Sequence, residues 1–447
     1  MPLEKPTFST STDRGLVLVT ALATLVLCLI LLSFSIKMVA THKTRELARK
    51  DVFLARAAAE SGVAFARSKI APLNHLSEIL SLNGLSHQLN ERQYFVLTIA
   101  MRHGYPLVTA TGHSGQQNHE VQAFLGSRIY KQGRNALVVL ESESGFYASG
   151  DSKIKGDVLL PATRIVSKAL HKLPAAPEPV VLGTVTKAGS RDRPVIKPLI
   201  ATMARRKILE ANSIQVGLGR LPSGDTWQLD GATHKFDSNL VLPKRIRHIV
   251  GPGTVLIRGN LELSHPIRVE EDAWLVASGD IQANAPLNLT ANLAAGGNLQ
   301  AHGVTGMASF FAVASLSLSA MDLHFPSLSA LIHLPELGRV SSPTLSLRDG
   351  TFAGSIFAWG PDSWLEPLIV VHPLVKASGI IYSPGRLELR APYEGHVFTR
   401  VLRSSSGART FTNWLKATQI DRTGIQELPV LPLGFSRDIQ VLQWVRR

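Results

Sequence analysis

The sequence predicts two structural classes in one chain: an α+β N-terminal part, with a long helix and a small antiparallel sheet, followed by an all-β parallel β-helix. Three observations predict this. Residues 16–36 form an apolar run without a charged side chain, residues 94–126 contain short alternating segments, and a five-residue motif recurs after 20 and then 18 residues. Alternation indicates strands, and a period near 20 indicates a solenoid. A chain of 447 residues, 45% of them hydrophobic, has room for two to three such units.

The apolar run at 16–36 is long enough to cross a membrane. About 20 residues that rise about 1.5 Å each span a hydrocarbon core of roughly 30 Å. A secretory signal would carry a small-residue cleavage site after its apolar region, and no such site follows this run. We therefore expect residues 16–36 to stay on the mature protein as a transmembrane helix, preceded by a leader at 1–15.

The junction formed by Arg14, Gly15 and the apolar run from Leu16 resembles the class III leader of type IV pilins and pseudopilins. The resemblance implies that a prepilin peptidase cuts at the processing junction between Gly15 and Leu16 and leaves the helix on the mature chain. These families usually carry Glu at the fifth mature position, where this chain has Thr20. Minor pilins and tip pseudopilins sometimes lack that Glu, so the resemblance indicates a minor or initiating subunit.

Residues 37–71 should continue the membrane helix as a stalk. The segment contains no Pro before Pro72 and is rich in strong helix formers. A partial apolar stripe is available to pack on a sheet or a neighbouring helix: Val39, Leu47, Leu54, Ala58 and Phe65. The stretch Ala57–Gly62 resembles the N-terminal regions of PilX-like and GspK-like minor pilins, which implies close helix approach when subunits stack in a fibre. A plain stalk of high helix propensity is the alternative.

Residues 72–147 are expected to form a small pilin-like head. A short helix is predicted around residues 75–90. Strand patterns follow at 94–101, 106–112 and 120–126, joined by the turn pairs His103-Gly104 and Ser114-Gly115. This arrangement predicts an antiparallel meander packed on the stalk helix.

The most specific internal signal is the motif G-[ND]-[IL]-x-[AL], which begins at Gly259, Gly279 and Gly297. Each coil can hold about three short strands, and we expect the glycine to supply a positive-φ corner between them. The neighbouring strands are predicted at Val255–Ile257, Trp274–Val276 and Leu287–Leu289.

The β-helix is expected to cover residues 227–402, with an irregular coil and Pro-rich linker at 148–226 and a C-terminal tail of unassigned role at 403–447. The motif also occurs at Gly156, so the solenoid can begin there and be interrupted. This combination resembles bacterial pilus-assembly proteins that end in a right-handed parallel β-helix. Residues 231–242 match the opening of that domain, and residues 378–389 match its close.

No sequence pattern indicates catalysis, a cofactor or a metal site, so we do not expect an enzyme. Glu270-Glu271-Asp272 is the acidic cluster of the repeats, and a solvated corner is favoured over a polysaccharide-cleaving site. The histidines of the N-terminal part form no H-E-x-x-H or H-x-H pair: His42, His75, His87, His103, His113 and His119. The single cysteine, Cys28, excludes an intramolecular disulfide and a Cys-based zinc site.

The net charge of +14, from 47 basic and 33 acidic residues, favours anionic partners such as lipid headgroups or polysaccharide. The basic residues form no block and have no aromatic platform, so specific nucleic-acid binding is not predicted. Five basic residues follow the apolar run closely, namely Lys37, Lys43, Arg45, Arg49 and Lys50. The positive-inside rule alone would leave the C-terminal bulk in the cytoplasm, whereas the resemblance to pilins places it outside, and we follow the resemblance.

The resemblance implies a structural minor pilin or pseudopilin-like component of a type IV pilus or related secretion filament. It would sit in the bacterial inner membrane as a single-pass protein, with its C-terminal bulk periplasmic or on the pilus. Its partners would be other pilin-like subunits and prepilin peptidase. Two alternatives stay open: a membrane-tethered β-helix that binds or cleaves polysaccharide, and a cytoplasmic bactofilin-like scaffold.

Overall fold

The computed structural model describes most of the chain. The described residues are 11–71, 78–79, 81–102, 104–128, 135–141, 145–162, 164–188, 199–338, 340–361, 364–406, 408–423, 430–431 and 439–445. Residues 11–17, 128, 430–431, 439–440 and 442–445 are described by their backbone alone. The contacts divide the chain into two compact units. One contains Met1–Val63, Gly84–Leu97 and Ala110–Val121, and the other contains Ala64–Asn83, Thr98–Thr109 and Gln122–Arg447.

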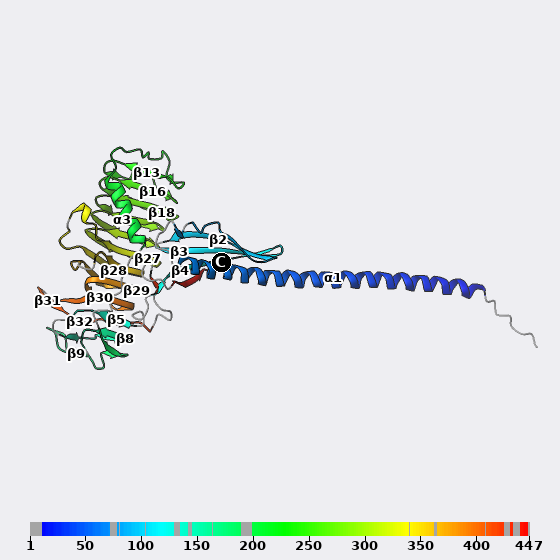
Figure 1. Cartoon of the computed structure of the whole chain (residues 1–447), viewed down its shortest axis with the longest axis horizontal. Coiled ribbons are helices and arrows are strands. Elements are labelled where there is room, and N and C mark those ends of the chain that lie inside the picture. Colours follow the sequence, from blue (N-terminus) through cyan, green and yellow to red (C-terminus); the bar gives the residue numbers. More distant parts are fainter. Residues whose placement is uncertain are drawn as a thin grey trace, which may run out of the picture. The chain divides into compact units, whose positions relative to one another are not determined.

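The expected continuation of the membrane helix into the stalk is confirmed, since both belong to one helix, α1 (Ser11–Ile70) (Figure 1). Its 60 residues extend about 90 Å at about 1.5 Å per residue. The helix ends two residues before Pro72, where the ring of proline disfavours helical geometry in the preceding residue.

The predicted antiparallel meander is confirmed, and it contains one strand more than expected. Its strands lie in the order β1 (Ser86–Asn90), β2 (Gln93–Arg102), β3 (Tyr105–Ser114) and β4 (Gln117–Arg128). The prediction of a helix across residues 75–90 is wrong for residues 86–90, which form β1 and pair antiparallel with β2. A two-residue turn at Glu91 and Arg92 brings the segment back along β2, so hairpin pairing prevails over local helix propensity. Residues 75–77 lie outside the described residues.

The C-terminal tail returns to this sheet. β34 (Val430–Leu431) and β35 (Ile439–Val445) both pair antiparallel with β4. The β-helix is therefore inserted in the sequence between β4 and the strands that extend the β4 edge of the head sheet.

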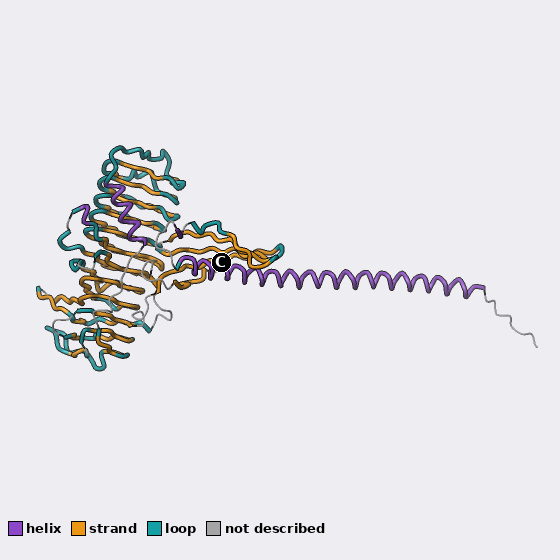
Figure 2. Tube along the Cα trace, in the orientation of Figure 1, coloured by secondary structure: helices purple, strands orange, loops and turns teal. Residues whose placement is uncertain are grey.

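The second large element is a parallel β-helix, as the sequence predicts (Figure 2). In its regular coils each strand pairs in parallel with the strand three positions later, which gives three faces. The first face contains β12 (Thr226–Gln228), β15 (His248–Val250), β18 (Ile267–Glu270), β21 (Leu287–Leu289) and β24 (Val304–Gly306). The second face contains β13 (Thr233–Phe236), β16 (Thr254–Ile257), β19 (Trp274–Ala277), β22 (Asn292–Ala295) and β25 (Ser309–Ala312). The third face contains β14 (Leu240–Val241), β17 (Leu261–Leu263), β20 (Ile281–Ala283), β23 (Asn298–His302) and β26 (Ser315–Ser319).

The later coils are built from longer strands that turn corners and cover more than one face. These are β27 (Met321–Ile332), β28 (Thr344–Trp359), β29 (Leu368–Leu389) and β30 (Tyr393–Ser406). The expected strands at Val255–Ile257 and Trp274–Val276 do pair with each other. Leu287–Leu289 was expected beside them but lies on the first face, because its strand pairs with β18 and β24.

The repeat motif marks the start of the third face. Leu261, Ile281 and Leu299 are cross-strand partners on consecutive coils and point into the buried core. The residue before each of them forms a ladder. The Asn260 N–H donates to Asn239 Oδ1 at 2.8 Å, and the Asp280 N–H donates to Asn260 Oδ1 at 2.8 Å. The Asn298 N–H continues the ladder with a 2.6 Å bond to Asp280 Oδ1.

The expected reason for the repeat glycines is only partly right. Gly259 has a φ of 119°, whereas Gly279 and Gly297 are not in the left-handed region. A Cβ at Gly279 would lie 2.2 Å from Asn260 Oδ1, and one at Gly297 would lie 2.3 Å from Asp280 Oδ1. The motif therefore requires glycine mainly because the ladder oxygen occupies the space that a side chain would need.

The prediction of an irregular coil and Pro-rich linker at 148–226 is wrong where the structure has strands or helix, and the motif at Gly156 does lead into a strand of the solenoid. Short strands of the segment add two further layers to the solenoid: β6 (Phe146–Ser149), β7 (Lys153–Lys155), β8 (Asp157–Leu160), β9 (Ile165–Ser167), β10 (Val181–Leu182) and β11 (Val185–Lys187). The same corner chemistry occurs here, since the Thr184 N–H donates to Asp157 Oδ1 at 2.9 Å. Residues 199–212 form α3 (Leu199–Asn212), which buries apolar side chains at helical spacing, among them Ile200, Ala204 and Ile208.

The coils do not stack in the order in which they occur along the chain. β5 (Asn135–Val139) pairs with β30 on one side and β8 on the other, so the first coils of the chain stack on the last ones. β33 (Gln419–Asp421) fills the same layer between β30 and β7. The chain must then reach the opposite end of the solenoid to begin β12, and α3 lies along the second face on this path, against β16, β19, β22 and β27 (Figure 1).

We predict that Gly279→Ala lowers the free energy of unfolding by about 1–3 kcal/mol, because the added methyl group must displace the Asn260 ladder oxygen. Guanidinium unfolding of the full chain in detergent would measure the loss. Gly224→Ala is the matched control, since a Cβ there meets no atom within 4 Å. Equal losses in the two variants would contradict the ladder explanation.

Candidate functional site

The predicted processing junction lies inside a helix. Gly15 and Leu16 both belong to the first turns of α1. The large apolar side chains that follow, through Ile36, are between 48% and 71% exposed. By length and composition this helix could cross a membrane, which is also true of many signal sequences.

The small residues of Ala57–Gly62 pack on the chain's own sheet, which corrects the expectation that they serve helix contacts in a fibre. Ala58, Ala59 and Gly62 are buried on the face of α1 that meets the sheet. A Cβ at Gly112 of β3 would lie 2.1 Å from the Ala55 carbonyl oxygen, so the two backbones are almost in contact. Larger residues on this face would push the sheet away, which explains the run of alanines.

The apolar stripe of the stalk also differs from the prediction. Val39 and Leu47 of the predicted stripe remain 67% and 53% exposed. Ala58 is buried as predicted, and Ala55 and Val63, which were not predicted, are buried as well. The packing face is therefore rotated away from the large side chains toward the small ones.

The acidic cluster at Glu270–Asp272 is engaged within the protein. Glu270 Oε1 lies 2.6 Å from Arg268 Nη2, and Asp272 Oδ2 lies 3.5 Å from Arg102 Nε on β2. Glu271 and Asp272 both have left-handed φ values near 57°, which form a tight corner between β18 and β19. Burial raises the pKa of Asp272 to about 7, against the opposing charge of Arg102. Glu270 and Asp272 therefore each lie beside an arginine at this corner of the β-helix.

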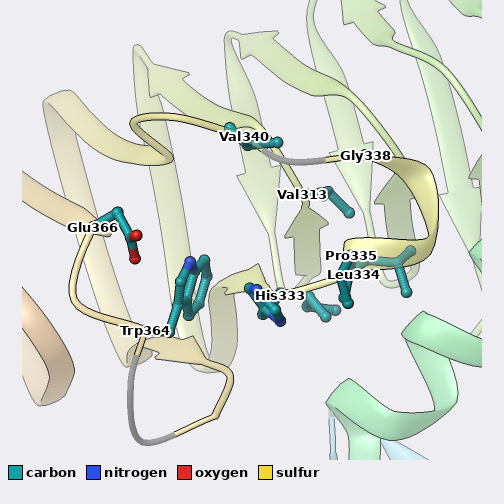
Figure 3. A pocket seen from close by; sticks show the side chains of 9 residues that line it. Val313, His333, Leu334, Pro335, Gly338, Val340, Trp364 and Glu366 are labelled. Atoms are coloured by element: carbon teal, nitrogen blue, oxygen red, sulfur yellow. The ribbon is translucent and has the colours of Figure 1, made fainter.

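A hollow of about 240 Å³ opens beside the second face, between the loop that follows β27 and the loop that follows β28 (Figure 3). Its lining residues are Val313, Ile332, His333, Leu334, Pro335, Gly338, Val340, Trp364 and Glu366. The His333 and Trp364 rings meet edge to face with centroids 5.2 Å apart. Burial lowers the pKa of His333, so the imidazole is neutral at pH 7. The described lining is mostly apolar, with His333 and Glu366 as its titratable side chains, so the hollow suits a small apolar group.

The N-terminal histidines that the structure describes pack against aromatic rings or lie on exposed surface. His87 packs against Phe95 and His113 stacks on Tyr94 at 4.4 Å, whereas His42 lies on the exposed part of α1. His75 and His103 lie outside the described residues. Within the described ranges, no group of three His, Cys, Asp or Glu side chains is arranged to hold a metal ion.

A row of polar side chains on the outer side of the third face was not predicted from the sequence. The variable fourth position of the repeat motif is occupied by Glu262, Gln282 and Gln300, which are cross-strand partners on three consecutive coils and point outward. The sequence indicates this row only through the fourth position of the motif, which is polar in all three repeats.

No known protein family matches the sequence, and no curated protein matches it. Two solved structures share distant similarity. A glycosylated ice-binding protein (LeIBP) from an Arctic yeast is 13% identical, and the similarity covers 68% of this chain and 98% of that one with a TM-score of 0.21. The competence-associated pilin ComZ from Thermus thermophilus is 11% identical, with coverage of 89% and 98% and a TM-score of 0.22. Similarities this weak support no conclusion about family or function. The fold is established by the strand pairing described above.

We predict that Asp272→Asn stabilises the protein at pH 8 and has little effect at pH 4. The raised pKa means that the folded state binds a proton more tightly than the unfolded state, so wild-type stability falls as the pH rises from about 4 through 7. The Asp272→Asn variant has no carboxylate to titrate at this position, so its stability does not fall in this way. A pKa raised by about three units corresponds to a decrease of at most about 4 kcal/mol. Unfolding temperatures between pH 4 and 8 would measure the difference. The exposed carboxylate Glu394 gives the control, Glu394→Gln; a pH dependence equal in both variants would contradict the role of Asp272.

Proposed function

We propose that the chain is a single-pass, membrane-anchored structural subunit of the minor pilin or pseudopilin type, without an enzymatic role. It would belong to a type IV pilus or related secretion filament of a bacterial inner membrane, and other pilin-like subunits would be its partners. The observation that carries the proposal is α1, one uninterrupted helix with exposed apolar side chains from Leu18 to Ile36. Exposed apolar surface of this extent needs lipid or other helices as its surroundings.

The packing of α1 supports the same proposal. Its buried stripe of small residues, including Ala55, Ala59 and Gly62, faces the strands of its own sheet. The large side chains of Leu47 and Phe53 stay exposed on other sides of the helix. A subunit that enters a filament needs this arrangement, with one helix face used inside the subunit and others left for neighbours.

Processing at Gly15 is the first test. Purified membrane-derived protein treated with prepilin peptidase should begin at Leu16 on N-terminal sequencing, and untreated protein should begin upstream. Gly15→Leu should block cleavage, because the proposed peptidase requires a small residue before the cut, whereas Thr12→Leu should be cut normally. A start at Met1 in both treated and untreated wild-type protein would remove the processing proposal.

Sidedness is the second test, because the basic residues after the span favour a cytoplasmic C-terminal bulk by the positive-inside rule. We expect protease added to intact spheroplasts to digest the β-helix and to leave a cytoplasmic marker protein intact. Protection of the β-helix until the membrane is lysed would instead favour the cytoplasmic scaffold.

A further inference from the structure

A bare length of α1 separates the apolar run from the head sheet. The apolar run ends at Ile36, and the head sheet bonds to the helix at Asp51, whose Oδ1 accepts a 3.3 Å hydrogen bond from Ser114 Oγ. Every side chain from Lys37 to Leu47 is exposed. The helix rises about 22 Å between Ile36 and Asp51, at about 1.5 Å per residue.

This bare length carries an excess of positive charge that the protein does not neutralise. Residues 37–50 contain one acidic side chain, Glu46, and five basic ones: Lys37, Lys43, Arg45, Arg49 and Lys50. All six are exposed, and none forms an ion pair with another residue that the structure describes. Arg45 and Arg49 are four residues apart, a spacing at which like charges on a helix repel each other. A partner of opposite charge would relieve this repulsion.

The direction of helical side chains brings the first of these charges toward the apolar run. Cα–Cβ bonds tilt toward the N-terminus of a helix, which for this segment is the side of the apolar run. Lys37 follows the run directly. Lys43 and Arg45 begin about 10 and 14 Å beyond Ile36, and their long side chains lean back toward it.

These distances match the outer layer of a lipid bilayer. The polar headgroup layer extends about 5–7 Å beyond the hydrocarbon core on each side. Charges are felt over about 10 Å more at 0.1 M salt. Lys37, Lys43 and Arg45 therefore lie within reach of the headgroups, whereas Arg49 and Lys50, about 20 Å beyond Ile36, lie outside that range.

The apolar neighbours of the first basic residue fit the same layer. Met38 and Val39 are 66% and 67% exposed directly after Lys37. Lysine and arginine lay their aliphatic stems along apolar surface and keep the charged group in the polar layer. A boundary between hydrocarbon and headgroups suits this mixture of side chains better than bulk water does.

We propose that Lys37, Lys43 and Arg45 form a basic collar on α1 that binds the phosphate groups of anionic phospholipids. The collar would gather these lipids around the helix at the membrane surface on the side of the β-helix. The proposal rests on the proposed function, because it requires α1 to span a membrane. It adds the class of lipid that surrounds the anchor and the residues that select this class.

The single cysteine provides a probe for the lipids around the span. Cys28 is exposed on α1 and can carry a fluorophore. The full chain is placed in phosphatidylcholine liposomes at 0.1 M salt, with a small fraction of either phosphatidylglycerol or phosphatidylcholine that bears a nitroxide quencher on its acyl chain. We expect labelled phosphatidylglycerol to associate about threefold more strongly than labelled phosphatidylcholine. In 1 M salt, where charges are felt over only about 3 Å, this preference should disappear.

Two matched variants locate the effect on the helix. Lys43→Gln combined with Arg45→Gln should lower the preference for phosphatidylglycerol by about twofold or more. Arg49→Gln combined with Lys50→Gln is the control, because it also removes one lysine and one arginine from the same bare helix but beyond the reach of the headgroups. The control should keep the wild-type preference. Glutamine is a strong helix former, so both variants preserve α1.

Three outcomes would overturn the proposal. Equal quenching by the two labelled lipids in the wild type would leave an acidic protein partner to explain the basic residues. A loss of preference in the control as large as in the collar variant would show that position along the helix is unimportant. Quenching of Cys28 by neither lipid would mean that α1 is outside the bilayer, and the proposed membrane anchoring would fail together with the collar. Equal quenching leaves the anchoring intact, so the two failures are distinguishable.

Discussion

One side-chain oxygen per coil fixes the register of the regular part of the solenoid. Asn239, Asn260 and Asp280 each accept the N–H of the equivalent residue on the next coil, at distances of 2.6 to 2.8 Å. A corner leaves backbone N–H groups outside the strand ladders, and a buried or half-buried donor without a partner is costly. Once the corners are aligned, the alternation along each strand sends leucine and isoleucine inward and polar residues outward. The core and the outer faces are thus both consequences of the same ladder.

The three faces then serve different purposes. The second face is apolar on its outer side and is covered by α3, with Val276, Ala294 and Phe311 buried in that contact layer. The third face carries amides and hydroxyls on its outer side, at Gln282, Gln300, Ser317 and Ser346. The first face carries mixed, exposed charges such as Arg268, Asp322 and Lys376. The solenoid therefore combines a face that is covered by α3 with faces that carry polar and charged side chains.

Local patterns predicted the helix, the meander and the repeat well, because each is encoded within about 20 residues. The apolar run of α1 predicts a helix by its length and composition alone, and Gly259, Gly279 and Gly297 share their motif. Elements whose partners lie far away in the sequence were missed. β35 pairs with β4 across more than 300 residues and has no local signal, and α3 lies between Pro-rich and basic segments that suggested a loop. For the acidic cluster, the sequence indicated a corner correctly but could not show that Arg102 of β2 lies beside it.

The pairing of β35 with β4 has a consequence for biosynthesis. The head is the first soluble part to leave the ribosome, yet the β4 edge of its sheet stays open until residues 439–445 have been made. An open edge strand invites pairing with other chains. If the protein is exported, its earliest domain must cross the membrane in an incomplete state and close only after the whole β-helix has followed. Chaperones that shield β4 during this interval would then be as important to the yield of folded protein as the stability of the finished molecule.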